Sequence, residues 1–382
     1  MAKIAIICDR ELLAPFDQRV WKGAKSFKNE GHTIDVITPH SKNANIIKEG
    51  INICCIKKVR FPGITAIKIL HKALKGNYDL FYCHEFDPLI YSFFLNLLQR
   101  KRIIWDCHEH YPSLLSTRIK RNGDIEKRPV IEKIIDKTIN LCLRNITAIT
   151  SVSAPLVNYY SSKKPTFTVP NFPNKFLFNP SKENKRIKDL YAGKKVIVYQ
   201  GGIKPGRGLR SLLAAMKIVI NKNPNALFVI VGGEIKNSEW DKQTYQFLKD
   251  YKENFLTTGW VKHSELAPYL VHADVGIIMF RPTHYNNIIG LPNKLFEYLA
   301  CGLPVISSNL PQIRMIIKHT KTGILVESDN PENIAKSILK IIVENNNKKY
   351  KTRCLKIANK FVWEVTERKL LKLVEKLTVT NL

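Results

Sequence analysis

Short runs of β-branched and aliphatic residues alternate with amphipathic stretches along the whole chain, each stretch roughly ten to twenty residues long. Continuous apolar runs are typical of strands buried on both faces of a parallel sheet, and the amphipathic stretches fit the crossover helices between them. The pattern therefore predicts an α/β fold with two doubly wound parallel sheets. The predicted strands are Lys3–Cys8, Thr33–Thr38, Ile51–Lys57, Asp79–His84, Arg102–His108, Ala148–Ser153 and Thr166–Pro170 in the first half, then Val196–Gly201, Ala226–Gly232, Asp274–Phe280, Pro304–Ser308 and Gly323–Glu327.

The alternation is interrupted once, between Asn171 and Lys194, where Pro, Asn and Lys are frequent and apolar periodicity is absent. Such a composition indicates a connection between domains. We therefore expect a first domain over residues 1–172, a linker over 173–194 and a second domain over 195–360. Ligands of open parallel sheets bind beyond the carboxyl ends of the strands, so the residues that follow strands are the candidates for chemistry.

Charge points to phosphate-bearing partners, although weakly. The 382 residues include 61 Lys or Arg against 32 Asp or Glu, a formal net charge of +29. This excess is spread over both halves, without a basic tail and without a motif that interleaves aromatic and basic residues for nucleic-acid recognition. The charge therefore favours a nucleotide substrate. The competing hypothesis is a basic nucleic-acid-binding protein, which salt-dependent affinity for RNA or DNA would reveal.

Compartment can also be judged from the chain. Its eight cysteines include no C-x-x-C pair, which is typical of free thiols in a reducing cytosol. No cleavable signal precedes the first strand, and the apolar stretch Leu89–Leu98 is too short to cross a bilayer. A cytoplasmic protein is expected. The stretch Arg118–Arg144 interleaves basic and aliphatic residues at helical spacing, so it is either a helix that contacts anionic lipid at the inner face of the plasma membrane or a solvated helix packed on its own domain.

The most informative segment reads IGLPNKLFEYLACGLPVISS, from Ile289 to Ser308. Pro292 suits the first position of a helix, Gly302 suits the residue that ends it, and Pro304 prevents its continuation. The segment predicts one short helix over about Pro292–Cys301 between two strands.

The start of this helix is a candidate anion site. The amide groups of Asn293, Lys294 and Leu295 lie at the positive end of the helix dipole, beside the Lys294 ammonium, which suits a diphosphate. Glu297 lies one turn deeper on the same face, where its carboxylate can accept hydrogen bonds from a ribose diol. The alternative is an ordinary surface pair of Lys294 and Glu297, and the proline and glycine brackets favour the site.

The run from Pro292 to Ile306 resembles the donor-site signature of family 4 retaining glycosyltransferases of the GT-B fold. The likeness extends over nearly the whole chain. Its weaker supporting pieces, in the family's order, are Gly31-His32, Ser151-Val152-Ser153, Val169-Pro170-Asn171, Gly259-Trp260-Val261 and Ala273-Asp274-Val275.

The resemblance implies two Rossmann-like doubly wound domains that face each other across a cleft, with residues 361–382, including Trp363, as a final helix packing back on the first domain. It implies retaining transfer of a hexose or N-acetylhexosamine from a nucleotide-diphosphate sugar, with UDP favoured. The acceptor would be a saccharide or a lipid-linked sugar in cell-surface polysaccharide synthesis. Neither a cofactor nor a catalytic metal is expected. A nucleotide-sugar epimerase or hydrolase on the same fold is the alternative.

Two positions depart from the family pattern. Ile289 stands where the family often has a glutamate that contacts the donor sugar, and Gly202 stands where it often has a phosphate-binding arginine. Arg207 occupies the position of the family's lysine and keeps a phosphate-binding cation, helped by Lys204. Gly201 and Gly202 allow the backbone to approach the ligand.

Acceptor-side candidates follow the strands of the first domain. The runs HEFDP from His84 and DCHEHYP from Asp106 bring three histidines, at 84, 108 and 110, to strand ends. By resemblance, His108 is the reaction-centre histidine that hydrogen-bonds the sugar, with Glu109 beside it. The His-x-His spacing at 108 and 110 lacks further ligands at metal-binding spacing.

Asp17 and Arg19 follow the first strand, where many family members have a glycine-rich loop. Arg19 contacts either the leaving phosphate or the acceptor, or else it makes a salt bridge at the start of a helix. The sequence does not decide between the two.

Overall fold

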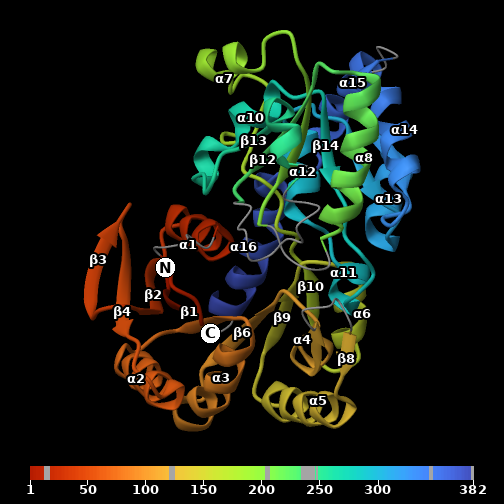
Figure 1. The fold of residues 1–382 in the computed structure, drawn as a ribbon. Helices are drawn as coiled ribbons and strands as arrows, with labels where there is room; N and C mark the ends of the chain where they lie inside the picture. The colour runs from red at the N-terminus through yellow and green to blue at the C-terminus, as the bar shows by residue number, and fades with distance from the viewer. Residues whose placement is uncertain are drawn as a thin grey trace. The chain divides into compact units, whose positions relative to one another are not determined.

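The computed structural model describes residues 1–12, 18–119, 125–202, 207–233, 246, 248–343 and 347–379. The chain divides into two compact units. Unit 1 consists of Met1–Arg118, Lys127–Asn171 and Val365–Leu382, and unit 2 consists of Ile119–Glu126 and Phe172–Glu364. Each unit is built on its own sheet, as the alternating pattern predicts (Figure 1).

The sheet of unit 1 has eight strands in the order β10-β9-β6-β5-β1-β2-β4-β3. All neighbours are parallel except β3, which pairs antiparallel with β4 at the edge. The strands are β1 (Lys3–Ile7), β2 (Thr33–His40), β3 (Ala44–Lys48), β4 (Ile51–Lys57), β5 (Leu80–His84), β6 (Arg102–Cys107), β9 (Ala148–Ser151) and β10 (Thr166–Thr168); β7 (Thr117–Ile119) and β8 (Ile125–Lys127) form a separate two-stranded sheet.

Connection handedness sorts the helices of unit 1 between the two faces of its sheet. From β4 to β5, β6 and β9 the chain moves in one direction along the sheet, and right-handed crossovers then place the connecting helices on one face. The β1–β2 connection runs the opposite way, so α1 covers the other face. There α1 is linked to the final helix α16, because Ser26 Oγ of α1 donates to Glu367 Oε2 of α16 at 2.6 Å. The helices are α1 (Gln18–Asn29), α2 (Pro62–Lys75), α3 (Phe86–Gln99), α4 (Tyr111–Ser116), α5 (Pro129–Leu143), α6 (Ala154–Ser161) and α16 (Trp363–Val379).

Unit 2 contains a six-stranded parallel sheet in the order β13-β12-β11-β14-β15-β16. Its strands are β11 (Lys195–Gln200), β12 (Ala226–Val231), β13 (Phe255–Thr257), β14 (Val275–Ile278), β15 (Val305–Ser308) and β16 (Gly323–Val326). Its helices are α7 (Lys185–Leu190), α8 (Leu209–Lys222), η2 (Lys252–Asn254), η3 (His263–Glu265), α10 (Ala267–Val271), α11 (Tyr285–Ile289), α12 (Asn293–Ala300), α13 (Pro311–Thr320), α14 (Pro331–Ile342) and α15 (Asn347–Ala358).

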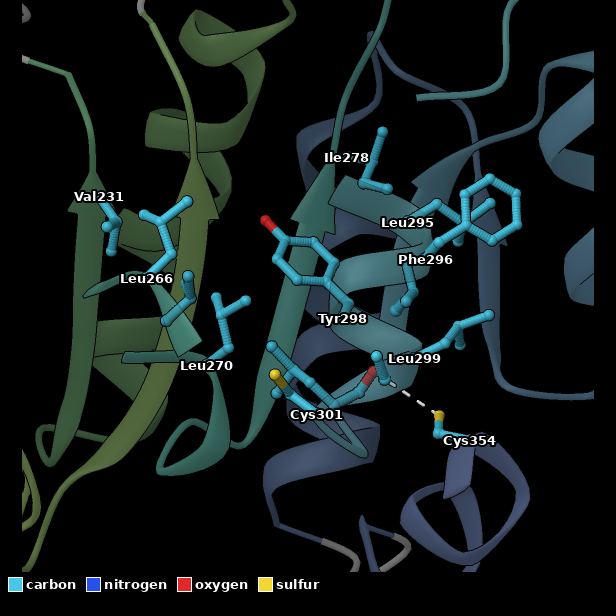
Figure 2. Close-up of a cluster of buried hydrophobic side chains, with 14 of the residues drawn as sticks. Val231, Leu266, Leu270, Ile278, Leu295, Phe296, Tyr298, Leu299, Cys301 and Cys354 are labelled. Atoms are coloured by element: carbon cyan, nitrogen blue, oxygen red, sulfur yellow. Dashed lines mark hydrogen bonds between the residues drawn. The ribbon is translucent and has the colours of Figure 1, made fainter. Parts of the chain in front are cut away.

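Helix α12 is held tightly against the sheet of unit 2. Leu295, Tyr298 and Leu299 are fully buried in the core cluster drawn in Figure 2. The Tyr298 ring lies so close to β14 that a Cβ on Gly276 would come within 2.6 Å of it. The Tyr298 hydroxyl accepts a hydrogen bond from the backbone N–H of Gln200 at 3.1 Å. The start of α12 is thereby fixed next to the end of β11.

Every strand predicted from the apolar runs is present, and its ends differ from the prediction by no more than two residues. The structure adds β3, β7, β8 and β13, which are short or lie at edges. The segment expected to be a linker, 173–194, belongs to unit 2, because Phe178, Ile187 and Tyr191 are buried in its core. Among the described residues, no helix combines the length and hydrophobicity needed to span a membrane.

Candidate active site

The Lys294 side chain is enclosed at the end of β11. Only 7% of the residue is exposed, and its Nζ donates to the Gln200 carbonyl oxygen at 2.8 Å. The same Nζ lies 4.4 Å from the centroid of the Tyr199 ring and 5.2 Å from that of Phe280. Burial, with a smaller contribution from the Arg207 guanidinium, lowers the pKa of Lys294 from 10.5 to about 7, against the opposing effect of Glu297. A bound anion would stabilise the charged form of this ammonium.

The carboxylate of Glu297 lies in the same region and is 4% exposed. Gln200 Nε2 donates to Oε2 at 2.6 Å, and His263 Nε2 lies 2.8 Å from Oε1. Each carboxylate oxygen can still accept a further hydrogen bond. Gln200 Oε1 and His263 Nδ1 are buried atoms without a hydrogen-bond partner among the described residues, so polar groups beside Glu297 remain available to a ligand.

The turn after β11 exposes backbone at this site. Gly201 has φ +105°, and among the described residues no atom outside the adjacent residues lies within 4 Å of the position a Cβ would take at Gly201 or Gly202. Gly208, with φ +63°, has no such room, because its Cβ would be 2.2 Å from the Met279 carbonyl oxygen. Arg207 stacks its guanidinium on the Phe280 ring at 4.5 Å. Lys204, the expected helper of Arg207, lies outside the described residues.

The start of α12 differs from the expectation in two details. Pro292 has extended backbone (φ −70°, ψ 132°) and precedes the helix, which begins at Asn293. Leu295 N donates to the Pro292 carbonyl oxygen at 3.0 Å, so a tight first turn consumes one of the three amides expected to bind an anion. The amides of Asn293 and Lys294 have no acceptor among the described residues, and Asn293 is exposed. This end of the helix therefore reaches the surface of unit 2.

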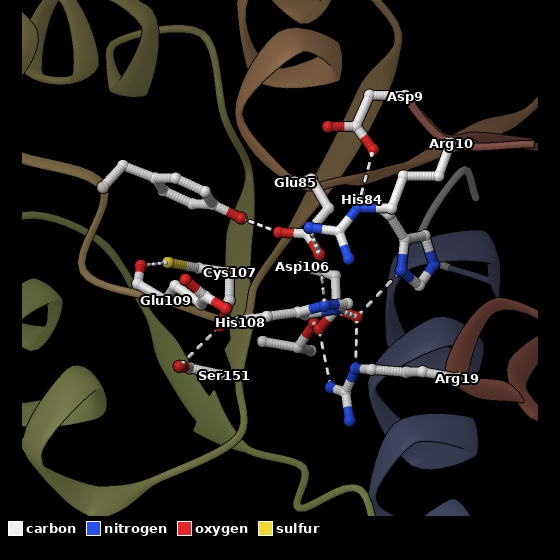
Figure 3. Close-up of polar contacts among 12 residues, drawn as sticks. Asp9, Arg10, Arg19, His84, Glu85, Asp106, Cys107, His108, Glu109 and Ser151 are labelled. Carbon is white, nitrogen blue, oxygen red and sulfur yellow. Dashed lines mark hydrogen bonds and ion pairs between the residues drawn. The ribbon is translucent and has the colours of Figure 1, made fainter. Parts of the chain in front are cut away.

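A second polar cluster lies at the carboxyl ends of β5 and β6 in unit 1, centred on the fully buried Asp106 (Figure 3). Arg19 binds both carboxylate oxygens, with Nε 2.6 Å from Oδ2 and Nη2 2.7 Å from Oδ1. His108 Nε2 lies 2.7 Å and His84 Nδ1 3.0 Å from Oδ2, and Thr150 donates to Oδ1 at 2.6 Å. Arg19, His108 and His84 hold the pKa of Asp106 well below its ordinary value although burial opposes them.

His108 is placed between two carboxylates. Its Nδ1 lies 2.9 Å from Glu85 Oε1, while Nε2 faces Asp106. Burial by itself would lower the pKa of His108, but Glu85 and Asp106 raise it to about 10. Burial would likewise raise the pKa of Glu85, yet His108 and, to a lesser extent, Arg10 and a hydrogen bond from Tyr111 lower it to about 2. The ring is therefore a cation with both nitrogens engaged, and a bond from His108 to a sugar would have to replace one of these contacts.

Glu85 was not predicted as a site residue. It is buried and has φ +75°, a strained conformation for a residue with a side chain. Two hydrogen bonds stabilise this backbone conformation. Glu85 N donates to the Asp106 carbonyl oxygen at 3.1 Å, and Trp105 Nε1 donates to the Glu85 carbonyl oxygen at 2.8 Å. Backbone strain supported in this way is typical of functional sites. The signal in the sequence was its place directly after β5.

The other acceptor-side candidates have mostly structural surroundings. Arg19 is 4% exposed and also donates to the Val169 carbonyl oxygen at 2.8 Å, which favours the ion-pair interpretation, with Asp106 as its partner. His84 is 1% exposed. His110 accepts a hydrogen bond from Ser113 N and thereby caps α4. Glu109 is half-buried next to His108, and Asp17 lies outside the described residues.

His84, Asp106 and His108 together offer three ligand atoms within 4.8 Å of one another, the arrangement of a candidate metal centre. The shared Asp106 oxygen already contacts Arg19 Nε at 2.6 Å. A metal ion bound there would face the Arg19 guanidinium at close range, and like charges repel strongly in a buried site. The contacts among the described residues therefore fit an ion-pair network better than they fit a metal site.

This network predicts a pH-dependent contribution to stability. The folded pKa of His108 is raised from 6.5 to about 10, so its contribution is complete below pH 6.5 and is lost as the pH rises to 10. The folded pKa of Glu85 is lowered from 4.5 to about 2, so its contribution is lost as the pH falls from 4.5 to 2. Both contributions are complete between pH 4.5 and pH 6.5, so in this range we expect the melting temperature of wild type to exceed that of His108→Gln by the largest amount. His71→Gln, at an exposed position, is the control, and a difference that does not change with pH would contradict the assignment.

Two parallel-sheet α/β units, with a buried lysine and glutamate on a short helix at the strand ends of the second, define the class of fold, which is GT-B. Residues 194–344 match the family described as glycosyl transferases group 1. The resemblance drawn from Pro292–Ile306 is confirmed at this level.

Individual comparisons agree with this assignment. The chain is 24% identical over 324 residues to TuaH of Bacillus subtilis, a glycosyltransferase assigned to teichuronic acid biosynthesis, with 78% of each chain covered. Sucrose-phosphate synthase from Thermosynechococcus elongatus superimposes with a TM-score of 0.76 at 16% identity, covering 99% of both chains. HepE from Anabaena in complex with UDP-glucose gives a TM-score of 0.73 at 13% identity, covering 98% of this chain and 100% of HepE.

Proposed function

We propose that the protein transfers a hexose or N-acetylhexosamine from a nucleotide-diphosphate sugar, with UDP as the favoured nucleotide, to a saccharide or lipid-linked acceptor in cell-surface polysaccharide synthesis. The observation that carries the proposal is the buried Lys294 ammonium at the start of α12, one turn from the Glu297 carboxylate. HepE, which shares the fold, holds UDP-glucose in its structure, and TuaH is assigned to teichuronic acid biosynthesis.

Each polar group of the unit 2 site has a role in this proposal. Lys294, Arg207 and the amides of Asn293 and Lys294 bind the pyrophosphate, and the open backbone at Gly201 and Gly202 lets it approach β11. Glu297 accepts hydrogen bonds from the ribose hydroxyls. Gln200 and His263, which contact the two oxygens of Glu297, hold that carboxylate in place.

Transfer with retention of the anomeric configuration fits these groups. The acceptor hydroxyl attacks the anomeric carbon from the face that the diphosphate leaves, and a departing diphosphate oxygen takes the hydroxyl proton. Lys294, Arg207 and the helix start stabilise the negative charge that develops on the leaving group. In unit 1, His108 and the adjacent Glu109 hydrogen-bond a sugar, and Glu85 orients the His108 ring through its 2.9 Å contact with Nδ1.

Arg207→Ala and Glu297→Ala are each expected to reduce turnover by at least about tenfold, because each removes a donor-binding contact. The fold should persist, since neither side chain belongs to the hydrophobic core of unit 2. Initial rates with a saturating donor, together with circular dichroism spectra, measure the two effects. Lys252→Ala, which changes an exposed side chain of the same unit, is the matched control. Wild-type turnover in both site variants would remove these residues from the site.

The activity itself is tested by incubating the protein with a panel of UDP- and GDP-sugars, with and without membrane and saccharide acceptors. NMR of the product anomeric proton reports the configuration of the new bond. Acceptor-dependent transfer with retained configuration supports the proposal. Conversion of the nucleotide sugar without an acceptor would instead identify an epimerase or a hydrolase, and an inverted product would overturn the retaining mechanism.

A further inference from the structure

Three helices of unit 1 expose large apolar side chains on the side that faces away from the sheet. The exposed fractions lie between 43% and 69%. We call these residues the helical face: Phe61, Ile64 and Ile67 at α2, Phe94, Leu97 and Leu98 on α3, and Val130, Ile134 and Leu141 on α5. Isolated exposed aliphatic residues are common on proteins, but a concentration of them on neighbouring helices marks an interaction surface.

The three helices that carry the helical face lie side by side. Right-handed crossovers put α2, α3 and α5 on the same side of the sheet, and α3 contacts both α2 and α5. Figure 1 shows them next to one another along the lower edge of the view. On α3, Phe94, Leu97 and Leu98 are spaced three and four residues apart and project from one side, while Leu95 is buried on the other. Each helix therefore has a second apolar side in addition to the one that covers the sheet.

Basic side chains accompany these apolar residues. Arg60, Lys68 and Lys75 are exposed at α2, a segment that has no acidic residue between positions 60 and 76. Lys133, Lys137 and Arg144 are exposed along or just after α5. The two acidic residues of α5, Glu132 and Asp136, are both half-buried, and the oxygens of Asp136 accept hydrogen bonds from Tyr159 at 2.6 Å and from Asn140 at 2.9 Å. The exposed charge of α2 and α5 is thus predominantly positive.

We infer that the helical face docks on the anionic surface of a lipid bilayer. Apolar side chains flanked by Lys and Arg on helices that lie flat are what an interfacial site requires, because the apolar groups enter the headgroup region and the cations meet lipid phosphates. Protein–protein interfaces are depleted in lysine, so the many lysines favour lipid over a protein partner. The inference concerns unit 1 alone and does not depend on the proposed donor site in unit 2.

Vesicle flotation with the whole chain tests the inference. Wild type should float with vesicles that contain phosphatidylglycerol and remain at the bottom with pure phosphatidylcholine. The triple variant Ile67→Asp, Leu97→Asp, Ile134→Asp and the charge variant Lys68→Glu, Lys133→Glu, Lys137→Glu should each lose at least about tenfold of the bound fraction. The matched control changes equally exposed apolar residues elsewhere, Ile47→Asp, Leu190→Asp, Met315→Asp, and should float as wild type does.

Thermal melts confirm that each variant is folded before its flotation is compared. Absence of wild-type binding to anionic vesicles would overturn the inference, as would undiminished binding by the folded apolar triple variant. Analytical ultracentrifugation tests whether a second copy of the chain, and not a bilayer, occupies the helical face. A wild-type dimer that the triple variant converts to monomer would show that the helical face binds a second copy of the chain and would also overturn the inference.

Discussion

Lys294→Met is expected to abolish UDP binding and to reduce kcat/KM by at least about 100-fold, without lowering the melting temperature of the ligand-free protein. Only 7% of the Lys294 residue is exposed, and burial is the main reason that the pKa of its ammonium falls to about 7. A buried cation without a bound anion contributes little to stability, whereas methionine fills a similar volume with no charge to desolvate. Loss of function without loss of stability is therefore the result that distinguishes a ligand-binding lysine from a structural one.

Isothermal titration with UDP and a thermal melt of the same preparation measure both parts of this prediction. Lys252→Met changes a highly exposed lysine of the same unit and should leave binding, turnover and melting temperature unchanged. If Lys294→Met unfolds at a clearly lower temperature and still binds UDP, Lys294 supports the core and the assignment of the donor site is wrong.

Asp106→Asn is expected to lower the free energy of unfolding by about 3–5 kcal/mol, because it leaves the buried Arg19 guanidinium without its carboxylate partner. Arg19 is 4% exposed and makes its two short contacts to Asp106, so solvent cannot replace the lost charge. The amide of asparagine has nearly the same shape as the carboxylate, so the loss reports charge and not a cavity. Urea denaturation at pH 7 measures the change.

A half-exposed acidic residue provides the matched control for this prediction. Asp136→Asn alters a contact to Lys163 at 3.6 Å near the surface of the same unit, while an asparagine oxygen can still accept one of the hydrogen bonds from Tyr159 and Asn140, so it should cost less than about 1 kcal/mol. The double variant Arg19→Met, Asp106→Asn should lose less than the sum of its single variants, since removing both charges leaves none unpaired. A loss below about 1 kcal/mol for Asp106→Asn would contradict the central role of this carboxylate.

The fold could be predicted because buried parallel strands are apolar on both faces and leave an unbroken run in the sequence. Strand β3 was missed for the complementary reason: Ala44–Lys48 lies at the sheet edge, and its exposed positions carry polar residues or an isolated isoleucine. Helix α12 was predicted because proline and glycine bracket it. Each of its ends lies one residue inside the prediction, and the use of the Leu295 amide also differs.

The partners within each site could not be predicted, because they come together through sheet register. His84 and Asp106 are aligned neighbours on β5 and β6, and nothing in either run of sequence indicates that the Arg19 side chain reaches Asp106. Similarly, Gln200 contacts Glu297 across 97 positions of sequence. Local patterns locate the ends of strands, whereas the identity of the facing side chains follows from the order of strands in the sheet.

The central claim is that the start of α12 binds the pyrophosphate of a nucleotide sugar, and a crystal structure of the protein with UDP tests it most directly. The predicted result places the diphosphate within hydrogen-bond distance of Lys294 Nζ and of the Asn293 and Lys294 amides, with the ribose hydroxyls on Glu297. UDP bound at another place, with these groups untouched, would contradict it.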